Sequence, residues 1–255
     1  VTQVVADANK VVLDDGSEVH YKQLIVAPGL VINWAAIEGL EETLGKNGVT
    51  SNYRYDLAPY TWELVQQTET GTAIFTQPPM PIKCAGAPQK ALYLSADYWL
   101  KNKRLNNINI DFCNAGGALF GVPAYVDALM SYIKKYRADL SFNHNLVKVD
   151  GATRKAWFDV TDADGNKTQV CKAFDMLHVC PPQSAPDFIR TSGLSDQAGW
   201  LDVNPQTLRH NHYSNIWGLG DVMNTTNAKT MAAVRKQVPV VATNICAVQA
   251  GKDPQ

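Results

Sequence analysis

The chain has no long apolar run, no marked excess of charge of one sign and no closely spaced cysteine pair. Its 255 residues carry 23 Lys and Arg against 24 Asp and Glu, for a formal net charge of −1. This balance gives no electrostatic reason to expect nucleic acid or an acidic membrane as a partner. No segment has the length of apolar sequence that a transmembrane helix needs, and no signal peptide opens the sequence. We expect a globular protein.

The cysteine and histidine patterns exclude two further classes. Five widely spaced cysteines without a C-x-x-C motif resemble neither a zinc site nor a disulfide framework, so we expect a reducing compartment. No histidine pair has metal-ligand spacing, and no metal is expected. His178 lies in an apolar strand and is predicted to be a satisfied core residue, whereas His210 and His212 are predicted to lie at the surface. A buried structural role is expected for Cys113, Cys171, Cys180 and Cys246.

Strands and helices alternate along the chain, which favours an α/β fold with a largely parallel sheet. Residues 70–185 are predicted to form one such unit. The flanks, residues 1–69 and 186–255, are predicted to form a second one. The sequence opens at Val1 in the middle of an element, as expected for a piece of a longer protein. The segment from 40 to 52 is predicted to be a loop.

One cysteine stands where a reactive thiol is expected. Cys84 follows a proline-rich loop and precedes a helix predicted from Pro88 onward, because apolar residues recur there at helical spacing and proline suits a first turn. The helix N-terminus and the neighbouring Lys83 both favour a thiolate. The alternative is a buried structural cysteine.

A second block combines glycine with aspartate. A short apolar strand runs into residues 218–221, Gly-Leu-Gly-Asp, and a helix is predicted to follow from about residue 228. Glycines let a ligand approach the backbone, and a helix N-terminus favours a phosphate or an electron-rich ring. An ordinary turn is the alternative. The helix is expected to kink at Pro239 and to pack along one stripe of residues, namely Val234, Val238, Val241, Ile245 and Val248.

With the strand at residues 24–29, this block resembles the later signatures of the flavoproteins that have two dinucleotide-binding domains. Within that superfamily the sequence is similar to the sulfide:quinone oxidoreductases. The matching stretches are residues 81–90, 176–182, 199–208 and 218–230.

The resemblance implies a function and its residues. It implies that residues 70–185 form a Rossmann-like, three-layer domain of the NAD-binding type and that the flanks form an incomplete FAD-binding domain. Sulfide would be oxidised through Cys84, and two electrons would pass through FAD to a quinone. The implied cofactor-binding residues are Pro28, Gly29, Gly218, Gly220, Asp221, Lys229 and Thr230.

The sequence departs from the family at two places. Val222 stands where the family has its second redox cysteine, and Cys180 is the one candidate to replace it. The first strand–GxGxxG–helix of the FAD site is also missing, so no FAD is expected to bind firmly to this chain alone. Residues 114–121 are not a nucleotide-binding fingerprint either, which favours an acceptor other than NAD.

Three alternatives remain open. One is the flavin subunit of a flavocytochrome c sulfide dehydrogenase or a related pyridine nucleotide-disulfide oxidoreductase. Another is an inactive truncated flavoprotein fragment, and a third is a family member that keeps FAD but has lost sulfide chemistry. The expected location is the cytoplasm or the face of a respiratory inner membrane, with any membrane contact made by regions outside this chain.

Overall fold

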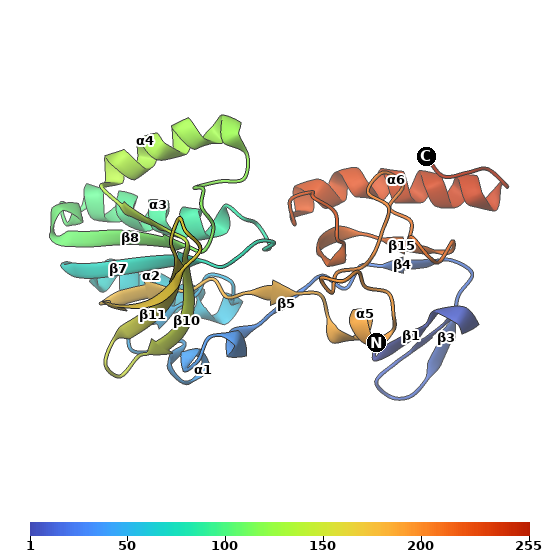
Figure 1. The fold of residues 1–255 in the computed structure, drawn as a ribbon, viewed down its shortest axis with the longest axis horizontal. Coiled ribbons are helices and arrows are strands. Elements are labelled where there is room, and N and C mark those ends of the chain that lie inside the picture. Colours follow the sequence, from blue (N-terminus) through green and yellow to red (C-terminus); the bar gives the residue numbers. More distant parts are fainter. The chain divides into compact units, whose positions relative to one another are not determined.

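The computed structural model describes residues 1–255 and divides them into two compact units (Figure 1). The first unit combines Val1–Val31 with Gln183–Gln255, and the second is the continuous segment Ile32–Pro182. The sequence placed residues 32–69 with the flanking unit, whereas the structure places them with the central one. The physical reason is strand pairing, because Val49 and Thr50 align in parallel with Leu177 and His178 of the central sheet.

The second unit is built on a five-stranded sheet with the order β6-β13-β7-β8-β9. Every pair of neighbouring strands in this sheet is parallel. The α/β class predicted from the sequence is therefore confirmed. These strands are β6 (Val49–Thr50), β7 (Gly71–Gln77), β8 (Ile108–Asn114), β9 (Asp139–Phe142) and β13 (Met176–His178).

Different layers cover the two faces of this sheet. Figure 1 shows α3 and α4 on one side of β7 and β8, with β10 and β11 on the other. The third layer is thus an antiparallel sheet, β10-β11-β12, rather than a second set of helices. The covering elements are α1 (Leu40–Thr43), α2 (Ala58–Gln67), α3 (Ala87–Lys101), α4 (Val126–Tyr136), β10 (His144–Asp150), β11 (Lys155–Thr161) and β12 (Lys167–Ala173), with short 3-10 turns at η2 (Trp34–Ala36), η3 (Tyr55–Leu57), η4 (Leu105–Asn107) and η5 (Pro123–Tyr125).

The two faces of β7 explain why its sequence is apolar almost throughout. Phe75 packs into the cluster under the helices, together with Trp99 of α3 and Phe112 of β8. Ile74 points to the opposite face and packs into the cluster shared with the antiparallel sheet. All these side chains are fully buried. A strand covered on both faces needs such a run, which makes β7 a rigid base for the loop that follows it.

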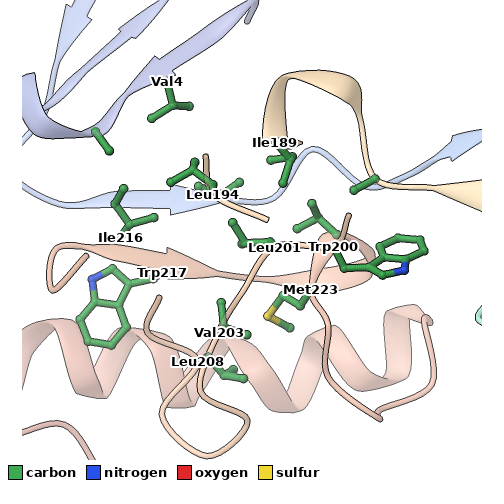
Figure 2. Packing of buried hydrophobic residues seen from close by; sticks show 14 of the residues in the cluster. Val4, Ile189, Leu194, Trp200, Leu201, Val203, Leu208, Ile216, Trp217 and Met223 are labelled. Carbon is green, nitrogen blue, oxygen red and sulfur yellow. The ribbon is translucent and has the colours of Figure 1, made fainter. Parts of the chain in front are cut away.

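The first unit surrounds a short parallel pair, β4 with β15. An antiparallel meander, β1-β2-β3, and two helices complete it. Figure 2 shows apolar side chains gathered around β15, with Ile216, Trp217 and Leu201 among the buried ones and α6 running beneath. The elements are β1 (Gln3–Val5), η1 (Ala6–Ala8), β2 (Lys10–Val12), β3 (Glu18–His20), β4 (Leu24–Val26), α5 (Asp187–Thr191), β15 (Ile216–Gly218), η6 (Gly220–Val222) and α6 (Met231–Gln249). The chain leaves and re-enters this unit at β5 (Val31–Ile32) and β14 (Gln183–Ser184).

The predicted stripe on α6 is wrong in part. Val241 is buried, but Val238 is 46% exposed. Two polar residues, Gln237 and Asn244, take inward positions instead. Gln237 accepts a hydrogen bond from the Gly220 N–H at 3.0 Å, so the polar side chain has a reason to face inward. The helix continues through Pro239, and none of the helices has the length and hydropathy of a membrane-spanning segment.

Candidate functional site

The two cysteines proposed for redox chemistry follow neighbouring strands of the parallel sheet. Cys84 lies in the loop after β7, and Cys180 lies two residues after β13. From β7 the chain builds β8 and β9 on one side, and β13 is then added on the other. Open α/β sheets bind ligands outside the carboxyl ends of their strands at such a reversal of strand order. The topology therefore brings both cysteine-bearing loops to the edge where ligands are expected.

Cys84 has a half-buried side chain and a backbone in the left-handed region, with φ of 49°. This conformation is uncommon for a residue other than glycine and needs support from its surroundings. The Ala87 N–H supplies some, donating to the Cys84 carbonyl at 2.7 Å as α3 begins. The cation at the sulfur is Lys90, one turn into α3, whose Nζ lies 3.9 Å from Sγ. The sequence predicts a cation beside this thiol but indicates only the neighbouring Lys83, not Lys90.

Cys180 is almost fully buried, with 1% of its surface exposed. Its N–H donates to the Thr76 hydroxyl at 3.1 Å, which ties the end of β13 to the end of β7. Burial raises the pKa of the Cys180 thiol to about 12, and an interaction with the Tyr53 hydroxyl opposes that rise. The structural role expected for this residue is therefore compatible with its burial, while Tyr53 gives it a polar neighbour.

Tyr53 is a site residue that sequence reasoning missed. It follows β6, the strand next to β13. Its hydroxyl donates to the carbonyl oxygens of Lys83 at 2.9 Å and Cys84 at 3.3 Å. Burial raises the pKa of Tyr53, and the Cys180 and Cys84 thiols raise it further. One phenol therefore contacts both cysteine-bearing segments, and we call Tyr53, Cys84 and Cys180 the sulfur site.

His178 supports the loop that carries Tyr53. Its Nε2 accepts a hydrogen bond from the Asn52 N–H at 3.0 Å, and its ring stacks on Phe75 with centroids 5.8 Å apart. Complete burial lowers the pKa of His178 to about 4, so the ring is neutral at pH 7. The predicted core location is confirmed. Its Nδ1, however, has no hydrogen-bond partner, so the residue is only half satisfied.

The Gly-Asp turn, residues 218–221, lies in the first unit at the carboxyl ends of β15 and β4. The Leu219 N–H donates to the Val26 carbonyl at 3.1 Å, so this turn lies beside the segment that contains Pro28 and Gly29. Gly29 and Gly220 both have positive φ, of 78° and 79°. Side chains other than glycine are strained there, which explains the glycines.

The predicted flavin-binding residues differ in whether their side chains already bind other groups of the chain. Asp221 is half-buried, and its main-chain carbonyl accepts a hydrogen bond. Lys229 is buried, and its Nζ already has partners within the chain. It donates hydrogen bonds to the carbonyls of Asp221 at 2.6 Å and Met223 at 2.8 Å. It also lies 3.8 Å from the centroid of the Trp200 ring. The Thr230 hydroxyl caps α6 by accepting from the Ala233 N–H at 3.3 Å.

Gly218 and Val222 are packing residues. A Cβ on Gly218 would lie 2.7 Å from the Met223 side chain and 2.8 Å from that of Val203, so glycine is required by close packing. Val222 is fully buried in the core of the first unit. A core hydrophobe thus occupies the position at which the resemblance implies a second redox cysteine.

Three surface and burial predictions need correction. His210 is buried at 3% exposure, where its Nε2 lies 3.0 Å from the Leu194 carbonyl and its Nδ1 accepts from the N–H groups of His212 and Tyr213. The polar residues around His210 in the sequence predicted exposure. The burial could not be predicted from them, because one hydrogen-bond partner, Leu194, comes from a separate segment. Cys171 and Cys246 are exposed rather than buried, and none of the five cysteines forms a disulfide.

Curated relatives match almost the whole chain. It is 38% identical over 254 residues to the mitochondrial sulfide:quinone oxidoreductase of Mus musculus, covering 100% of this chain and 56% of that protein. It is 40% identical over 247 residues to the same-named protein of Dictyostelium discoideum, covering 96% and 54%. Over almost its whole length the chain is similar to members of the sulfide:quinone oxidoreductase family. It spans about half the length of these relatives, and no protein-family model matches it.

Two solved structures share the fold of this chain. The X-ray structure of the sulfide:quinone oxidoreductase from Aquifex aeolicus matches with a TM-score of 0.71 at 18% identity, covering 95% of this chain and 60% of that one. A chain in the cryo-EM structure of the Tetrahymena thermophila mitochondrial ATP synthase matches with a TM-score of 0.84 at 24% identity, covering 100% and 63%. At these identities the matches show the fold alone.

Proposed function

We propose that the protein to which this chain belongs is an FAD-dependent oxidoreductase that oxidises sulfide through Cys84 and passes two electrons to a quinone. The observation that carries the proposal is the placement of Cys84: a half-buried thiol, in a strained backbone conformation, with the Lys90 cation at its sulfur and a second thiol across Tyr53. Reactive cysteines occupy electropositive and partly exposed surroundings of this kind. Sulfide and quinone come from the names of the relatives.

Cys180 is proposed as the redox partner that Val222 cannot be. Joining the two thiols in a disulfide removes two electrons and two protons. Sulfide then attacks the Cys84 sulfur, the S–S bond breaks, and Cys180 leaves as a thiolate with the electron pair of that bond. Cys84 keeps the added sulfur atom. The added sulfur then passes to an external nucleophile such as a thiol, which breaks the S–S bond of the persulfide and leaves Cys84 as a thiolate. FAD, when bound, would accept the two electrons released as the two thiols rejoin in the disulfide, and a quinone would take those electrons from it.

The first unit supports FAD through the Gly-Asp turn. The backbone at Gly29 and Gly220 and the carboxylate of Asp221 fit a ligand with hydroxyl and phosphate groups. Lys229 and Thr230 would act indirectly, because their side chains bind main-chain atoms of the turn and of the start of α6 rather than the ligand. FAD, when bound, would act as the two-electron acceptor.

The relatives also bear on location. Both carry the word mitochondrial in their names, and the cytoplasmic alternative finds no support among them. We propose that the protein acts at the mitochondrial inner membrane, where a membrane-dissolved quinone is available to it.

A second candidate is a flavin-binding member of the family that has lost sulfide oxidation. The burial of Val222 in the core favours it, because a side chain in that place cannot take part in sulfur chemistry.

Kinetics of the full-length protein separate the two candidates. We expect Cys84→Ser to lower the rate of sulfide-dependent quinone reduction by about a thousandfold or more, because the serine cannot accept sulfur. Cys180→Ser should lower it by about tenfold or more, because the sulfur that leaves is lost. Cys171→Ser is the matched control, since that thiol is exposed on β12. No sulfide-dependent reduction in the unaltered protein would favour the second candidate, and full activity in Cys84→Ser would refute the first.

A further inference from the structure

The loops of the sulfur site are held together by a tyrosine that comes from a third strand. Tyr53 follows β6, Cys84 follows β7 and Cys180 follows β13, and β13 lies between the other two strands in the sheet. The phenol therefore reaches across the end of β13. In doing so it joins segments that are far apart in the sequence.

The Tyr53 hydroxyl holds the Cys84 loop through main-chain atoms. Its bonds to the Lys83 and Cys84 carbonyls, at 2.9 and 3.3 Å, act where the backbone takes its left-handed turn. The second carbonyl also accepts from the Ala87 N–H at 2.7 Å. The conformation of Cys84 is thus fixed from the α3 side and from the Tyr53 side.

The same hydroxyl interacts with the Cys180 sulfur, and this contact lowers the pKa of a thiol that burial otherwise raises. A neutral thiol can donate to the phenol oxygen. Once that thiol ionises, the phenol can turn its proton toward the sulfur, and hydrogen bonds to charged groups are the strong ones. Burial and the two nearby sulfurs raise the pKa of Tyr53, which keeps the phenol protonated as a donor.

We propose that Tyr53 is the positioning residue of the sulfur site: its hydroxyl holds the Cys84 loop by donating to main-chain carbonyls while Cys180 is a neutral thiol, and it turns to donate to the Cys180 thiolate when that sulfur attacks, or departs from, the Cys84 sulfur. This inference rests on the pairing of Cys84 with Cys180 in the proposed function. It adds to that pairing the hydroxyl group that stabilises the thiolate form of the buried Cys180.

The test uses a chromogenic mixed disulfide and needs neither sulfide nor quinone. In the full-length protein, Cys171→Ser and Cys246→Ser remove the two exposed thiols of residues 1–255, and Cys84 is then converted to its mixed disulfide with thionitrobenzoate. The Cys180 thiolate attacks the Cys84 sulfur, the bond to thionitrobenzoate breaks, and the coloured thiolate is released as the Cys84–Cys180 disulfide forms. No external oxidant is needed for this exchange.

We expect Tyr53→Phe to slow this intramolecular release by about three- to tenfold at pH 8. Loss of a hydrogen bond to a thiolate raises its pKa by about one unit, and the higher nucleophilicity of the more basic sulfur recovers part of the loss. Tyr55→Phe is the matched control, because Tyr55 is 96% exposed two residues away.

A purely structural role is tested in a Cys180→Ala background, where an added dithiol releases the chromophore. There the attacking sulfur is external, so Tyr53→Phe should change the release rate less than twofold. Equal slowing in both backgrounds would overturn the proposal, as would an unchanged intramolecular rate or no intramolecular release at all. Sulfide-dependent quinone reduction is measured separately, so failure of the proposed function and failure of this inference give different results.

Discussion

Among single residues, Lys229 shows most clearly how the surroundings decide a role. The resemblance assigned it to the cofactor, yet its ammonium group donates to two carbonyls of the chain and lies over Trp200. Burial lowers the pKa of Lys229 to about 8, with Asp221 and Asp196 opposing the change. Lys229 therefore fixes the turn that carries Asp221.

This assignment predicts a pH-dependent stability. The unfolded lysine has a pKa of about 10.4, so between about pH 8 and 10 the unfolded state binds more protons than the folded state, and stability rises with pH. Lys229→Met should remove this dependence and leave two carbonyls without their donor. We expect the difference in free energy of unfolding between the unaltered protein and the variant to grow by about 2 kcal/mol from pH 7.5 to 9.5. Urea unfolding measures it, and a constant difference would contradict the role.

Among the elements, β13 connects the core to the sulfur site. Its two neighbours are β6 and β7, and its last residue, His178, holds the Asn52 N–H next to Tyr53. The position of the phenol therefore depends on a neutral imidazole at the end of a buried strand.

The pKa of His178 gives this element a pH signature. Because the folded-state value, about 4, lies below the unfolded value of about 6.5, the stabilisation is present above pH 6.5 and is lost as pH falls toward 4. From pH 7 to 5 the unaltered protein should lose about 2 kcal/mol more than His178→Gln, which keeps an acceptor for Asn52. Equal losses in chemical denaturation at the two pH values would show that burial does not keep this ring neutral.

Local patterns predicted the elements that contain their own signal. The apolar run of β7, the helical spacing of α3 and the hairpin of β11 and β12 all have their periodicity in neighbouring residues. The strand β6 could not be predicted in this way, because two residues gain strand geometry only by pairing with Leu177 and His178. Tyr53 was missed for the same reason. Lys90 was predictable in principle, since a helix beginning at Ala87 turns its first lysine back toward the preceding loop.

In the whole molecule, the two functional sets of residues belong to different units. The sulfur site lies entirely within Ile32–Pro182, and the Gly-Asp turn with its lysine lies entirely within the other unit. Each unit has its own buried core, the first around Trp217 and the second around Phe75. This separation allows the proposed sulfur chemistry to be examined at one site while the residues proposed to bind FAD are left unaltered.

The central claim is that sulfur from sulfide is transferred to Cys84. The most direct measurement is peptide mass mapping of the full-length protein after brief exposure to sulfide and a quinone, with the thiols trapped by an alkylating agent. The account predicts one added sulfur atom on the peptide that contains Cys84 and none on that of the exposed Cys171. Sulfide-dependent reduction of the quinone with no added sulfur on Cys84 at any time of quenching would contradict it.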